Sequence, residues 1–424
     1  MAAHDRRPVS VYACAWGIAA AIALTACGQA PTPSPEERHL PTPSPASTPR
    51  PAVPGPCPVP PGSPTLPALA ELPTTAFGLI SYLNAGGPLN DLVAALEAGA
   101  WLPPREQSLA QADLTGDGLD DLALAVLDPT AERITPPGSL YLLICSGEGY
   151  LLAYASPADA QAGGPLLRAV QDLTGDGLPE LVVSRGLCGA HTCSEHVEVL
   201  RWQGDTFTNI LDGTTEDLPT PSLALDGPTA AGAYDVSITA TGIASVGAGP
   251  FRPVTRTWSW DPSRQVFAIR TEVLLPSNYR IHVLHDADRA LEKGEYAQAH
   301  ELYRRVILDE TLDDWVTGAD GRANLGGFAM YRSMLAYLLA HDFGDGRVAY
   351  GILQNSYPDE AVGTAYARLA RAFWETYEPV EDAAAGCAAA EAFASTHPAE
   401  ILDPLGYGYA NRIYTAGDMC PPLP

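Results

Sequence analysis

One short sequence occurs twice in this chain. Asp-Leu-Thr-Gly-Asp-Gly fills positions 113–118 and again positions 172–177. In each copy, oxygen-bearing side chains stand at positions 1, 3, 5 and 9, and position 6 is a glycine, which permits a sharp turn. Oxygen ligands that converge in a tight loop suit a hard cation with many ligands, and calcium is the first candidate. The alternative is a pair of Asp- and Gly-rich turns that bind no ion.

The repeat does not fit an EF-hand, which needs a bidentate Glu at position 12 and a helix on either side. Position 12 is Leu124 in the first copy and Val183 in the second. The residues after the copies, 122–126 and 181–183, are short apolar runs of strand length. Each copy therefore predicts a tight nine-residue loop that leads into a strand.

This pattern resembles the FG-GAP/VCBS calcium-loop repeat of integrin-α-type β-propellers, whose usual form is D-x-N-G-D-G-x-x-D. Both copies carry Thr at the third position, and the second copy ends in Glu180, so the resemblance implies a weaker site than usual. It also implies one calcium ion per loop. The ligands it implies are Asp113, Thr115, Asp117, the Leu119 carbonyl and Asp121, and then Asp172, Thr174, Asp176, the Leu178 carbonyl and Glu180.

The first 26 residues have the features of an export signal. Arg6 and Arg7 precede an apolar stretch over 11–26, which is too short to span a bilayer comfortably. Leu-Thr-Ala directly before Cys27 resembles the lipobox of bacterial lipoproteins. The resemblance implies cleavage before Cys27, lipid on its sulfur, and a protein anchored to a membrane on the extracytoplasmic side. An ordinary signal peptide with a chance cysteine is the alternative.

Residues 27–74 are predicted to be a disordered linker. There are 16 prolines between Pro31 and Pro73, and such a segment prefers extended polyproline II. At about 3.1 Å per residue it spans roughly 100 Å or more. The formal net charge of −26 argues against a duplex nucleic-acid partner, which requires a basic surface.

Six cysteines remain once Cys14 leaves with the signal and Cys27 takes the lipid. An even number in an exported chain favours disulfides. We expect a local Cys188–Cys193 bridge and a Cys387–Cys420 bridge near the C-terminus, while Cys57 with Cys145 follows only by elimination. The alternative for the first pair is a metal cluster with His191 and His196, although the second pair of ligands of a zinc site is missing.

The segment 75–275 is predicted to be a β-rich domain with a helical lead-in. Apolar residues at helical spacing over 76–100 are interrupted at Gly86-Gly87-Pro88. Three units of strands follow, the first two begun by the acidic loops at an offset of 59 residues, and the third without such a loop. The strands are expected at 122–126, 139–145, 150–154, 181–183, 196–202, 206–210, 234–238, 254–260 and 266–269. Three units are too few for a closed propeller, so an open partial propeller and another compact assembly of sheets are the alternatives.

The segment 276–424 is predicted to be helical. Residues 288–306 resemble the tetratricopeptide repeat (TPR), with Gly294, Tyr296, Ala299, Tyr303 and Val306 at its turn and second-helix positions. Further helices are expected at 331–341, 348–356, 361–377 and 383–396, with irregular spacing. The fold class is thus multidomain α and β: a β-rich, partial-propeller-like domain with calcium loops, then an α-helical, TPR-like domain.

No motif in the sequence predicts catalysis. An H-E-x-x-H zinc signature is missing, and Asp342-Phe343-Gly344 lacks the other kinase motifs. His282 and His285 have metal-ligand spacing on a helix but no companion carboxylate pattern. We therefore expect a non-enzymatic, calcium-stabilised lipoprotein that binds a protein or a glycan. The alternative is a hydrolase of envelope polymer with a site assembled from scattered residues.

Overall fold

The computed structural model describes residues 54–423, except 105–106, 134, 157–158, 160, 244, 317–318 and 358–360. The export signal, Cys27 and the linker up to residue 53 lie outside the described residues. The chain divides into two units, Met1–Pro51 and Ala52–Pro424, and the description below concerns the second.

The β-rich part contains three antiparallel sheets of four strands, in each of which the strand order follows the chain order. Every sheet is therefore a simple meander, in which neighbouring strands are joined by hairpin connections. Their strands are β1 (Leu109–Ala112), β2 (Asp121–Leu127), β3 (Gly138–Cys145) and β4 (Tyr150–Ser156); β5 (Pro165–Gln171), β6 (Glu180–Cys188), β7 (Cys193–Trp202) and β8 (Phe207–Asn209); and β9 (Pro221–Asp226), β10 (Asp235–Ala240), β11 (Val254–Asp261) and β12 (Val266–Leu274).

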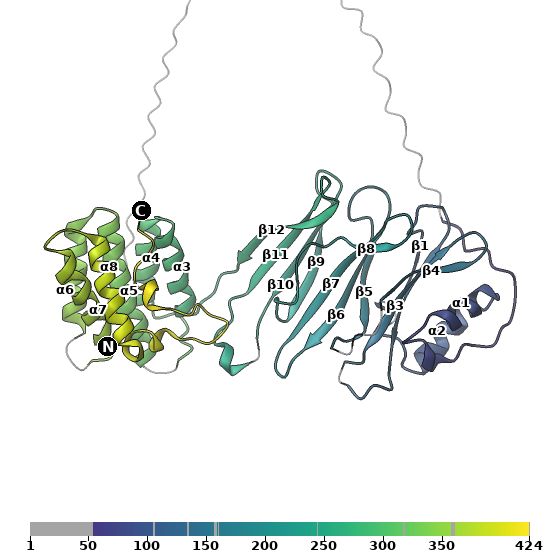
Figure 1. The fold of residues 1–424 in the computed structure, drawn as a ribbon, viewed down its shortest axis with the longest axis horizontal. Helices are drawn as coiled ribbons and strands as arrows, with labels where there is room; N and C mark the ends of the chain where they lie inside the picture. The colour runs from purple at the N-terminus through teal and green to yellow at the C-terminus, as the bar shows by residue number, and fades with distance from the viewer. Residues whose placement is uncertain are drawn as a thin grey trace, which may run out of the picture. The chain divides into compact units, whose positions relative to one another are not determined.

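The three sheets pack face to face (Figure 1): β2 and β6 are apolar on both sides, and β10 is apolar on the side that faces the second sheet. Successive side chains of a strand point to opposite faces. Ala123 and Ala125 of β2 pack with Leu181 of β6 from one face of the first sheet. From the opposite face of the second sheet, Val182 packs with Val236 of β10. The first two sheets share one core cluster, and the second and third share another.

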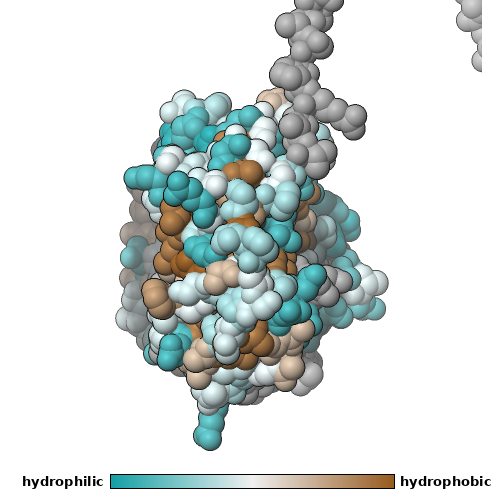
Figure 2. All heavy atoms as spheres, turned by 90° about the vertical axis from the view of Figure 1, so that its right-hand side faces the viewer, coloured by the Kyte–Doolittle hydropathy of each residue, from teal (hydrophilic) through white to brown (hydrophobic). Residues whose placement is uncertain are grey.

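Two helices cover the remaining face of the first sheet. They are α1 (Phe77–Asn84) and α2 (Leu89–Ala98), and they pack against Leu122 and Leu124 of β2. The predicted break between them is present at Gly86, whose φ is +82°. Figure 2 looks onto this side and shows hydrophobic side chains interspersed with hydrophilic ones.

The end of the predicted linker is packed in the structure. A disulfide joins Cys57 to Cys145 of β3, and Leu72 is buried in the same cluster as α1 and α2. Gly55 pairs with Leu119 as an isolated parallel bridge. Composition alone placed the linker boundary at 74, but the disulfide and the apolar residues of 54–74 hold this segment on the first sheet.

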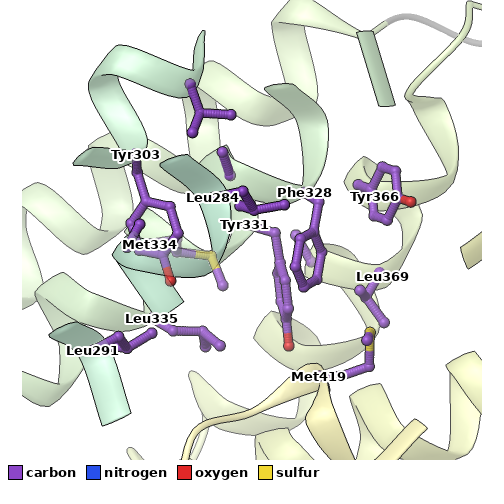
Figure 3. Packing of buried hydrophobic residues seen from close by; sticks show 14 of the residues in the cluster. Leu284, Leu291, Tyr303, Phe328, Tyr331, Met334, Leu335, Tyr366, Leu369 and Met419 are labelled. Carbon is purple, nitrogen blue, oxygen red and sulfur yellow. The ribbon is translucent and has the colours of Figure 1, made fainter. Parts of the chain in front are cut away.

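The C-terminal part is built from helices. They are α3 (Arg280–Glu292), α4 (Tyr296–Leu308), α5 (Ala319–Leu339), α6 (Phe343–Ser356), α7 (Thr364–Tyr377), α8 (Ala383–Thr396) and α9 (Pro398–Ile401). The turn between α3 and α4 is at Gly294, with φ of +75°, and Ala299, Tyr303 and Val306 are fully buried. Large aromatic side chains such as Tyr331 fill the core (Figure 3).

The coarse fold class is confirmed: sheets and helices both form, in the predicted order along the chain. The helices α7 and α8 lie close to the predicted ranges, whereas α5 begins twelve residues before the predicted 331. No helix within the described ranges is long and apolar enough to cross a membrane.

Candidate functional site

The first acidic loop, residues 113–120, is closed by the side chain of Asp113. Its Oδ1 accepts hydrogen bonds from the backbone N–H groups of Gly116 (2.6 Å) and Asp117 (3.1 Å), and its Oδ2 accepts one from Gly118 (2.8 Å). Gly116 and Gly118 each have φ of +83°, a conformation that glycine adopts without strain. The carboxylate at position 1 therefore stabilises the turn directly.

The last carboxylate of this loop, Asp121, lies at the start of β2 and is completely buried. Its Oδ2 accepts from the N–H groups of Leu114 (2.8 Å) and Thr115 (3.1 Å), and its Oδ1 accepts from that of Cys145 on β3 (2.8 Å). Burial raises the pKa of Asp121 to about 6, although these hydrogen bonds favour the charged form. Asp121 thus joins the loop to the neighbouring strand.

The second loop, residues 172–179, has the same design. Asp172 accepts hydrogen bonds from the N–H groups of Gly175 (2.7 Å) and Gly177 (2.9 Å). Glu180 is completely buried and accepts from the N–H of Leu173 (2.8 Å). Burial raises the pKa of Glu180 to about 7. The repeated sequence therefore gives a repeated loop conformation.

The two loops differ in one arginine side chain, which pairs with the carboxylates of the second loop. Arg201, on β7, donates a hydrogen bond to Asp176 Oδ2 at 2.5 Å, and its Nε lies 3.6 Å from Glu180 Oε1. The same guanidinium lies over the ring of Trp260, 5.2 Å from its centroid. Two of the three carboxylates in the second loop therefore have an arginine as counter-ion. No ion pair is found for Asp113, Asp117 or Asp121 among the described residues.

The fit to calcium is better in the first loop, because none of its carboxylates pairs with a cationic side chain among the described residues. The threonine hydroxyls do not distinguish the loops: that of Thr115 lies close enough to Asp121 to lower its pKa, and that of Thr174 donates to Glu180 Oε1 at 3.2 Å. Each loop brings its predicted ligands into one turn, but in the described part of the chain no three acidic, histidine or cysteine side chains converge on a point that would hold a metal. The carboxylates are directed at backbone N–H groups.

A third loop of the same length precedes β10. Residues 227–234 join β9 to β10, and this length of eight residues equals that of 113–120 and 172–179. Its sixth residue, Gly232, has φ of +87°, and its ninth is Asp235, the first residue of the strand. Gly227 and Ala231 replace the aspartates of positions 1 and 5. This loop was not predicted, although Thr229, Gly232 and Asp235 have the spacing of positions 3, 6 and 9.

The predicted pairs Cys188–Cys193 and Cys387–Cys420 are both disulfides. A metal cluster at Cys188 and Cys193 is therefore wrong, since a disulfide leaves no thiolate to bind a metal. His196 of that proposed cluster instead contacts Glu216 through Nδ1 at 2.8 Å.

A groove of about 490 Å³ lies between α4, α5 and α6. Its apolar members include Leu308 and Ile352, which are 59% and 50% exposed. His300 stacks on Tyr337 with ring centroids 3.7 Å apart, and its Nε2 is buried without a hydrogen-bond partner. The lining residues are Ala297, His300, Glu301, Arg304, Ile307, Leu308, Met330, Ser333, Tyr337, Ala349 and Ile352. Helix periodicity did not single them out.

The remaining sequence motifs have structural explanations. The Asp342-Phe343-Gly344 triplet begins α6, and Asp342 caps that helix by accepting a hydrogen bond from Asp345 N at 3.2 Å. His282 uses both ring nitrogens for hydrogen bonds, Nδ1 with Ser277 Oγ (2.7 Å) and Nε2 with the Pro250 carbonyl (3.1 Å). His282 is therefore not arranged as a metal ligand.

The comparisons with known proteins were negative. No protein-family model matches this chain, and neither a curated protein nor a solved structure shows significant similarity to it. The function is therefore argued from the sites themselves.

Proposed function

We propose that this protein is a non-enzymatic, extracytoplasmic scaffold that is anchored to the cell envelope through Cys27 and binds a segment of another protein in the groove between α4, α5 and α6. The groove is the observation that carries the proposal. Exposed aliphatic side chains such as Leu308 and Ile352 cost free energy in water, and covering them with a partner removes this cost. The apolar lining favours a protein segment over a glycan.

Calcium has a stabilising role in this proposal. The first loop offers Asp113, Thr115, Asp117, the Leu119 carbonyl and Asp121, a set of hard oxygen donors of the kind that calcium prefers. The second loop is the weaker candidate because Arg201 already neutralises Asp176 and Glu180. We also propose that the acidic loops are related to FG-GAP repeats and that α3 and α4 form a tetratricopeptide-like pair.

Affinity capture from native membranes tests the groove. Leu308→Asp and Ile352→Asp each place a charge on the apolar floor, and both side chains are exposed, so the fold should tolerate them. Val380→Asp is the matched control, because Val380 is 66% exposed and is not part of the groove lining. In the presence of calcium, we expect wild type and Val380→Asp to capture the same membrane proteins. Leu308→Asp and Ile352→Asp should both fail to capture them. Equal capture by all four proteins would refute the groove as the binding site.

The alternative function is hydrolysis of envelope polymer. A pair of opposed carboxylates across a cleft would favour it, with one pKa raised to supply a proton. Asp121 and Glu180 have raised pKa values, but their oxygens face backbone N–H groups within separate loops. Release of reducing sugars or peptides from purified envelope polymer, measured with wild type and Asp121→Asn, would distinguish the enzyme from the scaffold.

A further inference from the structure

The three disulfides differ in how well solvent reaches them. Cys188 ends β6 and Cys193 begins β7, and both residues are exposed at the tip of this hairpin. The Cys57–Cys145 bridge lies in the core that α1 and α2 share with the first sheet, where its residues are 8% and 2% exposed. The Cys387–Cys420 bridge is partly buried against the helical core. A thiol in the surrounding medium therefore reaches the hairpin bridge without any opening of the fold.

The hairpin around the exposed bridge has a weak sequence for strand pairing. Gly186, Gly189 and Ala190 lie at or next to its tip, and these residue types have low strand propensity. Cys188 and Cys193 are directly opposite each other as the last pair of the β6–β7 ladder. The disulfide therefore holds the start of β7 against β6 where the side chains contribute little.

The start of β7 lies beside the chain segment that leads from the second sheet to the third. This segment, residues 210–220, joins β8 to β9 and is called the crossover below. The β8 strand pairs with residues 200–202 at the end of β7. Beside the start of β7, the crossover takes the place of a partner strand.

Three hydrogen bonds attach the crossover to the start of β7. The Thr220 N–H donates to the Cys193 carbonyl at 2.7 Å. The Thr215 hydroxyl donates to the Glu195 carbonyl at 2.6 Å and accepts from the Val197 N–H at 2.9 Å. Thr215 is only 2% exposed, so its two bonds are internal. One of the three bonds thus ends on a residue of the disulfide itself.

Thr220 also connects the crossover to the third sheet. Its Oγ1 donates to the Gly242 carbonyl at 2.9 Å, and its own carbonyl accepts from the Thr241 hydroxyl at 2.9 Å. Both partners follow β10 directly. Thr220 has φ of +48°, which is unfavourable for a β-branched residue and persists only where the surrounding contacts fix it. Loss of the contact with Cys193 removes one of the bonds that fix this conformation.

We propose that the Cys188–Cys193 bridge is a redox-sensitive switch: an external dithiol reduces it, and reduction releases the crossover from β7. One thiolate of the dithiol attacks a sulfur of the bridge, a mixed disulfide forms, and the other cysteine leaves as a thiolate that takes up a proton. The second thiol of the dithiol then displaces the first cysteine, so the dithiol is oxidised to its own disulfide by two electrons.

Reduction removes the covalent link between β6 and the start of β7. The start of β7 then opens locally, and the hydrogen bonds to Thr215 and Thr220 open with it. The central pairs of the β6–β7 ladder lie in the apolar core and stay closed. The switch does not involve the groove between α4, α5 and α6, so its failure would leave the proposed function intact.

Graded reduction with dithiothreitol tests the first step on the folded, exported protein. Samples are alkylated at intervals, and the labelled cysteines are identified by peptide mass spectrometry. We expect Cys188 and Cys193 to be labelled at least tenfold faster than the cysteines of the other two bridges, because those bridges are shielded by the fold. Equal rates at all three bridges, or slower labelling of the hairpin bridge, would overturn the proposal.

Hydrogen exchange tests the second step, because the amides of Thr220 and Val197 donate two of the bonds between the crossover and β7. After reduction of the hairpin bridge, both amides should exchange at least fivefold faster, while those of β2 should not change. The double variant Cys188→Ser with Cys193→Ser should show the fast exchange without reductant. Thr192→Ser is the matched control, since it alters the same hairpin tip and leaves the bridge intact. Unchanged exchange at Thr220 and Val197 after reduction would overturn the proposal.

Discussion

Asp288 is a carboxylate without exposed surface in the helical core, and its replacement should destabilise the helical part strongly. Its Oδ1 accepts hydrogen bonds from Tyr303 Oη (2.6 Å) and Arg332 Nε (3.0 Å), and its Oδ2 accepts from Tyr414 Oη (2.6 Å). The side chains of Asp288 and Arg332 are both 0% exposed. Arg332 in turn donates through Nη1 to the carbonyls of Asp418 and Met419, so the pair also holds the C-terminal segment.

Asp288→Asn keeps the size of the side chain but leaves the Arg332 guanidinium buried without a counter-charge. Removing one partner of a buried ion pair costs about 3–5 kcal/mol. A loss of about 1 kcal/mol lowers the melting temperature of a unit of this size by about 2–4 °C, so the expected decrease is about 10 °C. The double variant Asp288→Asn with Arg332→Met removes both charges and should recover part of this loss, because no uncompensated charge is then left in the core.

Thermal unfolding followed by circular dichroism at 222 nm is the appropriate assay, because helices dominate the signal at this wavelength. The control is Glu301→Gln, which breaks an ion pair whose side chains are 59% and 62% exposed. Solvent screens such a pair, so its melting temperature should stay within error of the wild type. If Asp288→Asn melts no earlier than Glu301→Gln, the argument from the buried charge is refuted.

Three further predictions concern other parts of the chain. Cys27→Ser should move the protein from the membrane fraction to the soluble fraction, as judged by immunoblotting, and an unchanged distribution would rule out this anchor. Calcium in hundredfold excess over its dissociation constant should stabilise an occupied loop by about 2.7 kcal/mol. Asp117→Ala should remove most of the calcium-dependent rise in melting temperature, and Asp176→Ala should remove less of it. The full rise in the double variant would refute both sites. Burial lowers the pKa of His285 to about 3, despite Asp288 nearby. Because the unfolded state takes up a proton near pH 6.5 and the folded state does not, His285 should lower the free energy of unfolding by about 3 kcal/mol between pH 7 and pH 4. Urea titrations of His285→Phe at the two pH values should therefore show a correspondingly smaller loss.

Local patterns in the sequence were sufficient to predict most helices and strands. The break at Gly86 and the apolar runs after the acidic loops predicted α1, α2, β2 and β6. The start of α5 was missed because Gly321, Gly326 and Gly327 lower its intrinsic helix propensity. In the fold those glycines are useful, since a Cβ on Gly327 would lie 3.1 Å from a ring carbon of Tyr366 on α7. Tertiary packing, which a local pattern does not contain, decides this boundary.

The candidate sites were predictable only where their residues are close in sequence. Both acidic loops were found from nine consecutive residues each. Arg201 is 25 positions from Asp176 and reaches it only because β7 pairs with β6. Likewise, Thr220 reaches Cys193 only because the segment between β8 and β9 runs beside β7. Contacts of this kind depend on strand register and on helix packing, so a single sequence gives no sign of them.

Three loops of equal length lead into β2, β6 and β10, and they differ in how the turn is closed. All three have eight residues, a left-handed glycine at position 6 and a carboxylate at position 9. The third loop lacks the acids of positions 1 and 5, yet it leads into β10 as the others lead into β2 and β6. In the first two loops the aspartate at position 1 accepts hydrogen bonds from the N–H groups of the turn and the carboxylate at position 9 is buried, so these residues close the turn as well as add charge.

That added charge has a different outcome in each loop. Arg201 neutralises it in the second loop, and Gly227 and Ala231 eliminate it in the third. Only in the first loop do both aspartates, Asp113 and Asp117, stand without the charge of a cationic side chain beside them within the described structure. If calcium binds this protein, its stabilising effect should therefore concentrate at the first loop, where Gly55 and the Cys57–Cys145 disulfide attach the start of the folded unit to the first sheet.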